Sequence, residues 1–295
     1  GNTPLIKLRK ITPKNDVEIW LKVEAGNPTG SYKDRMALCV LTEAIKAGKI
    51  RQGDTIVEYT GGSTGSSLAF VSAALGLKFV AVFSDAFSES KKKTMEAYGA
   101  KVLVEKSFGK GITPDLINRM KLKALKLASE PSFFYADQFG SENVLKGYIP
   151  MGNEISADLD SIDVFCAAVG TGGAVMGAWE GLNKENSKLI VFEPKQSPFL
   201  TTGQGGAHKV EGIGVGFEPP FLDRSLVSEI KCIDQEAAFL MCRKLAREEG
   251  IFCGGSTGLN VLGALEVAED LRPGSRVVTL ACDSGLKYLG GRIFP

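Results

Sequence analysis

The sequence is almost without histidine, since His208 is the only one in 295 residues. One histidine gives little support for a serine-protease-type triad and cannot form a histidine-rich metal centre. We therefore expect no metal site. The six cysteines never form a Cys-x-x-Cys pair, which argues against a zinc site or a disulfide framework. They are expected to be buried free thiols in a reducing compartment, and His208 an ordinary loop residue.

An excess of charge of one sign is also lacking. Lys plus Arg number 35 and Asp plus Glu 34, so no net field attracts nucleic acid or an anionic membrane. The longest apolar runs, such as residues 164–169, have the length of a strand and cannot span a bilayer. No signal-peptide pattern opens the chain, and we expect a cytoplasmic location.

Short apolar runs alternate with longer segments of helical periodicity. This alternation predicts an α/β protein in which helices cover both faces of a parallel sheet. The expected strands are residues 18–23, 55–59, 78–83, 101–105, 162–168, 188–192 and 276–281. The expected helices are residues 36–47, 66–75, 88–98, 115–128, 174–181, 235–249 and 259–269. The length of 295 residues is sufficient for two domains.

Three glycine-rich turns each precede an expected helix and follow an expected strand, which ends at residues 57–59 for the first, 167–169 for the second and 251–252 for the third. Residues 61–65 and 254–258 share the pentapeptide Gly-Gly-Ser-Thr-Gly, and Gly-Thr-Gly-Gly occupies 170–173. Backbone N–H groups at helix N-termini bind anions, and such turns gather beyond the carboxyl ends of parallel strands. One such turn is an ordinary connection, whereas three together predict an anion-binding site. The dinucleotide and P-loop fingerprints are absent, so a dehydrogenase is a weak alternative.

Lys33 lies at an expected helix start within Ser31-Tyr32-Lys33-Asp34-Arg35. A lysine there opposes the helix dipole, which favours a functional role over simple solvation. A buried lysine loses proton affinity and becomes a nucleophile toward an aldehyde and, once released, a general base. We therefore predict Schiff-base chemistry at this residue.

Residues 27–35, Asn-Pro-Thr-Gly-Ser-Tyr-Lys-Asp-Arg, resemble the lysine motif of the cysteine synthase and cystathionine β-synthase family. Members are pyridoxal-phosphate enzymes of fold type II, similar to the tryptophan synthase β-subunit. Matching motifs follow in order along nearly the whole chain, at residues 1–5, 170–173, 212–217, 254–258 and 283–288. The resemblance implies a two-domain, three-layer αβα fold with twisted, parallel-rich sheets.

The expected division gives a smaller N-terminal α/β domain over residues 31–140. A larger α/β domain, formed by residues 1–30 and 141–295, would carry the loop for the cofactor's phosphate. Within the smaller domain, residues 88–128 form a lysine-rich unit that is predicted to be a mobile lobe.

The resemblance implies a role for each matching residue. Lys33 is expected to be catalytic and to form the internal aldimine with pyridoxal 5′-phosphate. The residues expected to bind the cofactor are Lys33, Ser63, Gly170, Thr171, Gly172, Gly173, Ala174 and Ser256. Ser256 would hydrogen-bond the pyridine nitrogen. The residues expected to bind the substrate are Thr60, Gly61, Thr64, Gln138 and Gly212.

Three positions depart from the family pattern. Relatives usually carry Thr-Ser-Gly-Asn-Thr-Gly where residues 60–65 read Thr-Gly-Gly-Ser-Thr-Gly. Gly61 thus lacks a hydroxyl, and Ser63 offers a shorter side chain than asparagine. Ala174 stands where a threonine is usual. These changes preserve the cofactor chemistry and leave the identity of the substrate open.

The implied reaction is β-replacement on an activated L-serine of the O-acetylserine type, with sulfide or another thiol adding to an aminoacrylate intermediate. One alternative is a cystathionine β-synthase-like activity, or a lyase or dehydratase acting on serine or another β-substituted amino acid. A second, of a different class, is a catalytically silent paralogue that binds the cofactor or an amino acid. The expected partners are a small amino-acid substrate and a second copy in a homodimer, with no nucleic acid and no membrane.

Overall fold

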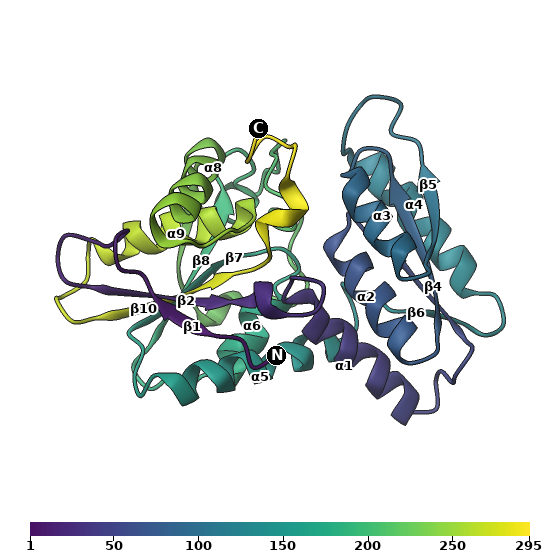
Figure 1. The fold of residues 1–295 in the computed structure, drawn as a ribbon, viewed down its shortest axis with the longest axis horizontal. Helices are drawn as coiled ribbons and strands as arrows, with labels where there is room; N and C mark the ends of the chain where they lie inside the picture. Colours follow the sequence, from purple (N-terminus) through teal and green to yellow (C-terminus); the bar gives the residue numbers. More distant parts are fainter. The chain divides into compact units, whose positions relative to one another are not determined.

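The computed structural model describes residues 1–295 and has the mixed α/β class that the sequence predicts. The chain folds into two compact units (Figure 1). Unit 1 comprises Gly1–Tyr32 and Tyr148–Pro295, and unit 2 comprises Lys33–Gly147. No helix combines the length and the apolar character that crossing a membrane requires.

Unit 1 is built on a six-stranded sheet in the order β1-β2-β10-β7-β8-β9. The strands are β1 (Leu5–Lys7), β2 (Glu18–Val23), β7 (Val164–Ala168), β8 (Lys188–Pro194), β9 (Val227–Ile233) and β10 (Arg276–Ala281). Only the edge strand β1 runs antiparallel to its neighbour. Every residue of β7 is buried, as expected of a central strand covered on both faces.

Helices cover both faces of this sheet. In Figure 1, α8 (Gln235–Lys244) and α9 (Gly255–Ala268) lie on one side, and α6 (Gly173–Gly181) lies on the other with the unit 1 part of α5 (Glu142–Asp158). The short helix α7 (Phe199–Thr202) follows β8. A continuous apolar core joins the strands to α8 and α9, with Phe192, Phe239 and Leu259 among its buried members.

The periodicity of the sequence did not reveal α5, because it contains Gly147, Pro150 and Gly152. A Cβ atom on Gly152 would lie 2.0 Å from the carbonyl oxygen of Ala178. One on Gly181 would lie 2.1 Å from that of Ile149. α5 and α6 therefore pack backbone against backbone, and the residues that weaken the helical pattern are the ones that permit this approach.

Unit 2 contains a four-stranded, fully parallel sheet in the order β5-β4-β3-β6. The strands are β3 (Thr55–Tyr59), β4 (Lys78–Ser84), β5 (Lys101–Glu105) and β6 (Phe133–Tyr135). The helices are α1 (Lys33–Lys46), α2 (Ser63–Ala74), α3 (Glu89–Ala97) and α4 (Pro114–Ala128). α4 packs on one face of the sheet, where Leu116 and Met120 meet Val57 and Tyr59.

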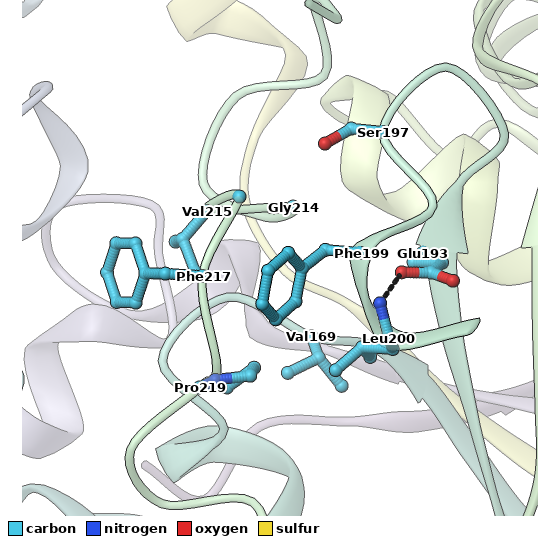
Figure 2. A pocket seen from close by; sticks show the side chains of 10 residues that line it. Val169, Glu193, Ser197, Phe199, Leu200, Gly214, Val215, Phe217 and Pro219 are labelled. Atoms are coloured by element: carbon cyan, nitrogen blue, oxygen red, sulfur yellow. Dashed lines mark hydrogen bonds between the residues drawn. The ribbon is translucent and has the colours of Figure 1, made fainter. Parts of the chain in front are cut away.

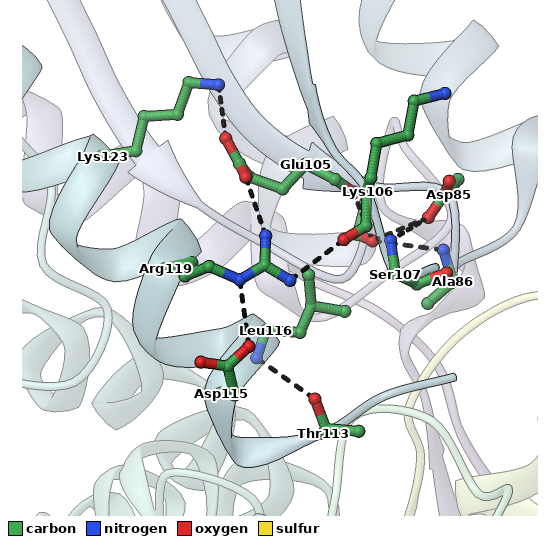
Figure 3. Close-up of polar contacts among 11 residues, drawn as sticks. Asp85, Ala86, Glu105, Lys106, Ser107, Thr113, Asp115, Leu116, Arg119 and Lys123 are labelled. Atoms are coloured by element: carbon green, nitrogen blue, oxygen red, sulfur yellow. Dashed lines mark hydrogen bonds and ion pairs between the residues drawn. The ribbon is translucent and has the colours of Figure 1, made fainter. Parts of the chain in front are cut away.

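Ion pairs tie α4 to the end of β5 (Figure 3). Arg119 contacts the Glu105 carboxylate at 3.0 Å, and Lys123 contacts it at 2.5 Å. Arg119 also pairs with Asp115 one helical turn away, at 3.0 Å. These ion pairs connect α4 and β5 within unit 2. Movement of residues 88–128 as a lobe stays a prediction, as do the domain boundaries proposed from the sequence.

The two central strands of unit 1 separate toward their carboxyl ends. β7 and β10 pair only at Val164↔Val277 and Phe165↔Val278. Beyond these pairs, the buried Asn260 of α9 bonds to both strands. Its Oδ1 accepts the Ala168 N–H at 2.7 Å, and its Nδ2 donates to the Leu280 oxygen at 2.8 Å. Thr279 Oγ1 of β10 also donates to the Cys166 oxygen of β7, at 2.7 Å, so the side chains of Asn260 and Thr279 together replace the missing strand pairing.

We predict that Asn260→Ala lowers the free energy of unfolding by about 2–5 kcal/mol, because it leaves a buried N–H and a buried carbonyl without partners. Urea denaturation measures this change. Asn183→Ala, at an exposed position, is the control and should be nearly neutral. Equal stability of the two variants would contradict the structural role given to Asn260.

Candidate active site

Three segments of unit 1 meet just beyond the carboxyl ends of its parallel strands. The Tyr32 N–H donates to the Cys282 oxygen at 3.0 Å, and the Ser284 N–H donates to the Gly30 oxygen at 2.9 Å. The Gly254 N–H donates to the Asp283 oxygen at 3.3 Å. The chain immediately before Lys33 is therefore fixed at this edge of the six-stranded sheet.

Lys33 is the first residue of α1 and is 9% exposed. Its neighbours Asp34 and Arg35 are also buried. The sequence predicted a functional lysine at a helix start, and burial of the residue agrees with that chemistry.

Residues 170–173 connect β7 to α6 through backbone that leaves no room for side chains at two of its glycines. Gly172 caps α6 with a φ of +88°. A Cβ on Gly170 would lie 2.3 Å from the Gly212 oxygen. The Ala174 and Val175 N–H groups of the first turn have no acceptor within the chain. Backbone donors at a helix N-terminus make this loop a cradle for an anion.

The loop at residues 212–217 is held against this cradle. The Gly214 N–H donates to the Val169 oxygen at 2.9 Å, and the Phe221 N–H donates to the Thr171 oxygen at 3.1 Å. His208 Nε2 donates to the Gly214 oxygen at 2.9 Å. His208 lies in a loop, and its ring fixes the backbone at Gly214. Burial lowers the pKa of its imidazole, which favours the neutral form.

A small pocket lies beside the same loop (Figure 2). Its walls are mostly apolar and include Phe199, Val215, Phe217 and Pro219. The buried Glu193 at its edge accepts the Leu200 N–H at 2.6 Å, which fixes the start of α7. The pocket borders the anion cradle without contributing a free charged group to it.

The third glycine-rich turn opens α9 and differs from the expectation. No strand precedes it, because Cys253 forms only an isolated bridge with Ser284. Ser256 is buried, and its hydroxyl has no hydrogen-bond partner within the chain. Thr257 Oγ1 accepts the Cys282 N–H at 3.0 Å and so connects this turn to the end of β10.

In unit 2, the turn at residues 60–65 forms a second anion cradle. Thr60 Oγ1 accepts the N–H groups of Gly62 and Gly65, at 3.0 and 3.1 Å, and keeps its own hydrogen for donation. The Ser63 and Thr64 N–H groups at the start of α2 have no acceptor within the chain. This end of α2 is suited to a carboxylate or a phosphate.

The structure brings Thr64 and Gln138 together, although 74 positions separate them in sequence. Thr64 Oγ1 donates to Gln138 Oε1 at 2.8 Å, and Gln138 Nε2 donates to the Tyr59 oxygen at 3.0 Å. Gln138 Nε2 retains one further hydrogen for a ligand. The Thr64 hydroxyl is already engaged, so its direct role is to position Gln138.

Gly61 faces the ring of Phe87. A Cβ at this position would lie 3.0 Å from Phe87 Cε1, so any larger residue requires the ring to move by a few tenths of an ångström. Phe87 also packs against Phe83, with ring centroids 5.5 Å apart. Position 61, which lacks a side-chain hydroxyl, thus lies beside the aromatic ring of Phe87 in the neighbouring loop.

The predicted site residues fall into one set in each unit. Unit 1 holds Gly170, Thr171, Gly172, Gly173, Ala174, Gly212 and Ser256, and unit 2 holds Lys33, Thr60, Gly61, Ser63, Thr64 and Gln138. Sequence reasoning missed Glu58, Phe87 and Asn260. Only Glu58 carried a local signal, because it is a lone acid in an otherwise uncharged, buried strand.

Comparisons with known proteins identify the family of this chain. A family model described as pyridoxal-phosphate dependent enzyme matches residues 1–283. A cysteine synthase of Staphylococcus aureus is 36% identical over 301 residues, covering 100% of this chain and 94% of the relative. The structure of an O-ureido-L-serine synthase superimposes with a TM-score of 0.93 at 34% identity, covering 99% of this chain and 92% of that one.

An O-acetylserine dependent cystathionine beta-synthase from Helicobacter pylori gives a TM-score of 0.91 at 34% identity, covering 100% of this chain and 96% of that one. The chain therefore belongs to the family of pyridoxal-phosphate dependent enzymes, and the family and fold predicted from its motifs are confirmed.

The residues of this chain fit pyridoxal 5′-phosphate. Unpaired N–H groups at the start of α6 suit its phosphate, and the partner-free hydroxyl of Ser256 suits a ring nitrogen. Lys33 is a buried lysine, the residue type that would react with its aldehyde. Positions 170 and 172 are glycine because an added Cβ would lie 2.3 Å from the Gly212 oxygen and 2.7 Å from the Leu222 nitrogen, respectively.

We predict that Gly170→Ala weakens cofactor binding by about tenfold or more, because the Gly212 carbonyl must move and the cradle opens. Titrating cofactor-free protein with pyridoxal 5′-phosphate, followed by visible absorbance, measures the affinity. Gly26→Ala is the control, since the nearest atom to its added Cβ is 3.8 Å away. An affinity for Gly170→Ala equal to that of the control would refute the cradle.

Proposed function

We propose that this protein catalyses β-replacement on an activated L-serine of the O-acetylserine type, with sulfide or another thiol as the incoming group. The buried lysine that follows an anchored segment carries the proposal. Two separate anion cradles, one in each unit, support it because the reaction needs one for a phosphate and one for a carboxylate. The similarity to a cysteine synthase and to an O-acetylserine dependent cystathionine beta-synthase points the same way.

In this proposal the cradle of unit 1 holds the cofactor. The free backbone N–H groups of Ala174 and Val175 would bind the phosphate, and the hydroxyl of Ser256 would meet the ring nitrogen. When bound, pyridoxal 5′-phosphate supplies an aldehyde for the lysine and a ring that withdraws electrons from the substrate's α-carbon. Ser256 is neutral and does not enforce protonation of the ring, which suits loss of a β-substituent better than transamination.

The residues of unit 2 bind the substrate and move its proton. The Thr60 hydroxyl, the free N–H groups of Ser63 and Thr64, and the remaining hydrogen of Gln138 Nε2 hold the carboxylate. Lys33 Nζ removes the proton from the α-carbon, after which the β-substituent leaves and the thiol adds.

The choice of β-substituent is set by the positions that depart from the family pattern. The Phe87 ring beside Gly61 gives the substrate-binding loop an apolar wall where relatives have a hydroxyl. Ser63 and Ala174 each offer fewer side-chain donors than the usual residues. Larger thiols, as in a cystathionine β-synthase-like reaction, are the competing choice of incoming group.

The proposal also covers the oligomeric state, a conformational change and the cellular location of the protein. We propose a homodimer on the resemblance to cysteine synthases, and closure of residues 88–128 over the bound substrate to exclude water. A cytoplasmic location is consistent with six free cysteines and a nearly neutral net charge. We also propose the two domains expected from the sequence, one formed by residues 31–140 and the other by residues 1–30 and 141–295.

The test is a turnover assay on the holoenzyme with O-acetylserine and sulfide, alongside other β-substituted amino acids and larger thiols. Lys33→Ala should lower turnover by at least about a hundredfold, as expected for loss of a general base. Lys49→Ala, at an exposed lysine of the same unit, should leave it unchanged. If cofactor-loaded wild type turns over none of these amino acids, the silent-paralogue alternative is correct instead.

A further inference from the structure

Glu58 is a fully buried acid near the end of β3, with 0% exposure. Its neighbours Val57 and Tyr59 belong to the core that packs against α4, and Glu58 is the charged residue between them. It forms no ion pair with any lysine or arginine of the chain. A buried carboxyl group is costly unless hydrogen bonds satisfy it, so its partners show what it does.

Both carboxyl oxygens of Glu58 accept hydrogen bonds from the substrate-binding region. Oε1 accepts the Tyr59 N–H at 3.0 Å, and Oε2 accepts the Gln138 N–H at 2.9 Å. Burial raises the pKa of Glu58 to about 8, against the opposing effect of the Gln138 N–H. The Tyr135 side chain also acts to lower the pKa of the carboxyl group. Ionised or neutral, a carboxyl group retains acceptor capacity on both oxygens.

The bond to Gln138 stabilises a strained turn. Asp137, the preceding residue, has a φ of +54°, a conformation that a residue other than glycine adopts at a cost. The Gly140 and Ser141 N–H groups donate to the Asp137 oxygen at 3.1 and 2.9 Å and close the turn. Glu58 fixes the backbone of Gln138, the residue after Asp137, whose side chain must point toward Thr64.

The Gln138 side chain connects Glu58 to the anion cradle of unit 2, at residues 60–65. Its Nε2 donates to the Tyr59 oxygen at 3.0 Å, and its Oε1 accepts from Thr64 at 2.8 Å in the first turn of α2. A continuous chain of buried hydrogen bonds thus leads from Glu58 to the loop that opens α2.

We infer that Glu58 is a positioning residue for substrate binding, which acts by fixing Gln138 and, through it, Thr64. The inference rests on the proposed function, because it assigns the carboxylate cradle of unit 2 to the amino-acid substrate. It assigns Glu58 no contact with substrate or cofactor.

The test is Glu58→Gln in the holoenzyme. Glutamine fills the same space but has one acceptor oxygen, and its amide group opposes one of the two N–H donors. We expect KM for the amino acid to rise about tenfold, while kcat stays within about threefold of wild type. The dissociation constant of glycine, which has no β-substituent to lose, should rise about tenfold as well when followed by cofactor absorbance.

A double-mutant cycle with Gln138→Ala separates positioning from general destabilisation. With the Gln138 side chain removed, Glu58→Gln should change KM by less than it does in wild type. Met120→Ala, in the core under α4, is the stability control and should leave KM unchanged. Affinity for pyridoxal 5′-phosphate should be unchanged in Glu58→Gln, which keeps this result distinct from failure of the cofactor site.

An unchanged KM and glycine affinity in Glu58→Gln, or an effect that simply adds to that of Gln138→Ala, would overturn the inference. If wild type proves inactive, the glycine measurement still decides the role of Glu58. If Glu58→Gln fails to fold, hydrogen exchange of the wild-type Gln138 amide decides instead. We expect strong protection there, and exchange at the rate of an exposed loop would refute the role.

Discussion

The separation of β7 from β10 is the constraint on which unit 1 depends. Strand pairing stops after two residue pairs, and Asn260 bonds to both strands beyond that point. β7 therefore leads directly into the Gly170–Gly173 cradle, and β10 leads into the segment that anchors Tyr32. The anion cradle and the backbone before Lys33 are both products of this opening, as ligand sites of parallel sheets generally are.

The two copies of the pentapeptide Gly-Gly-Ser-Thr-Gly form different hydrogen bonds because they lie in different surroundings. In residues 61–65 the threonine donates to Gln138, and the amides of Ser63 and Thr64 stay free at the start of α2. In residues 254–258 the threonine accepts from Cys282, and Ser256 keeps an unpartnered hydroxyl. The first copy is thus suited to an anion and the second to a single polar atom, because their surroundings use different donors and acceptors.

Much of the fold and part of the site were predictable from the sequence. Continuous apolar strands such as residues 55–59 and 276–281 were predicted with the observed bounds, since burial on both faces leaves a clear pattern. The short strand β6 and the glycine-containing α5 leave no such pattern. The strand expected at Ile251–Phe252 was wrong, because that segment forms no strand and the next residue forms only an isolated bridge. Glu58 and Asn260 act through partners 80 and 92 positions away, which no local motif can reveal.

The proposed chemistry depends most on Lys33 as the residue that joins the cofactor. Reducing the holoenzyme with borohydride makes the link between the cofactor aldehyde and the lysine amine permanent, and peptide mass mapping then locates it. We expect a single modified peptide that contains Lys33. Modification of another buried lysine, such as Lys91, or of none, would contradict this role.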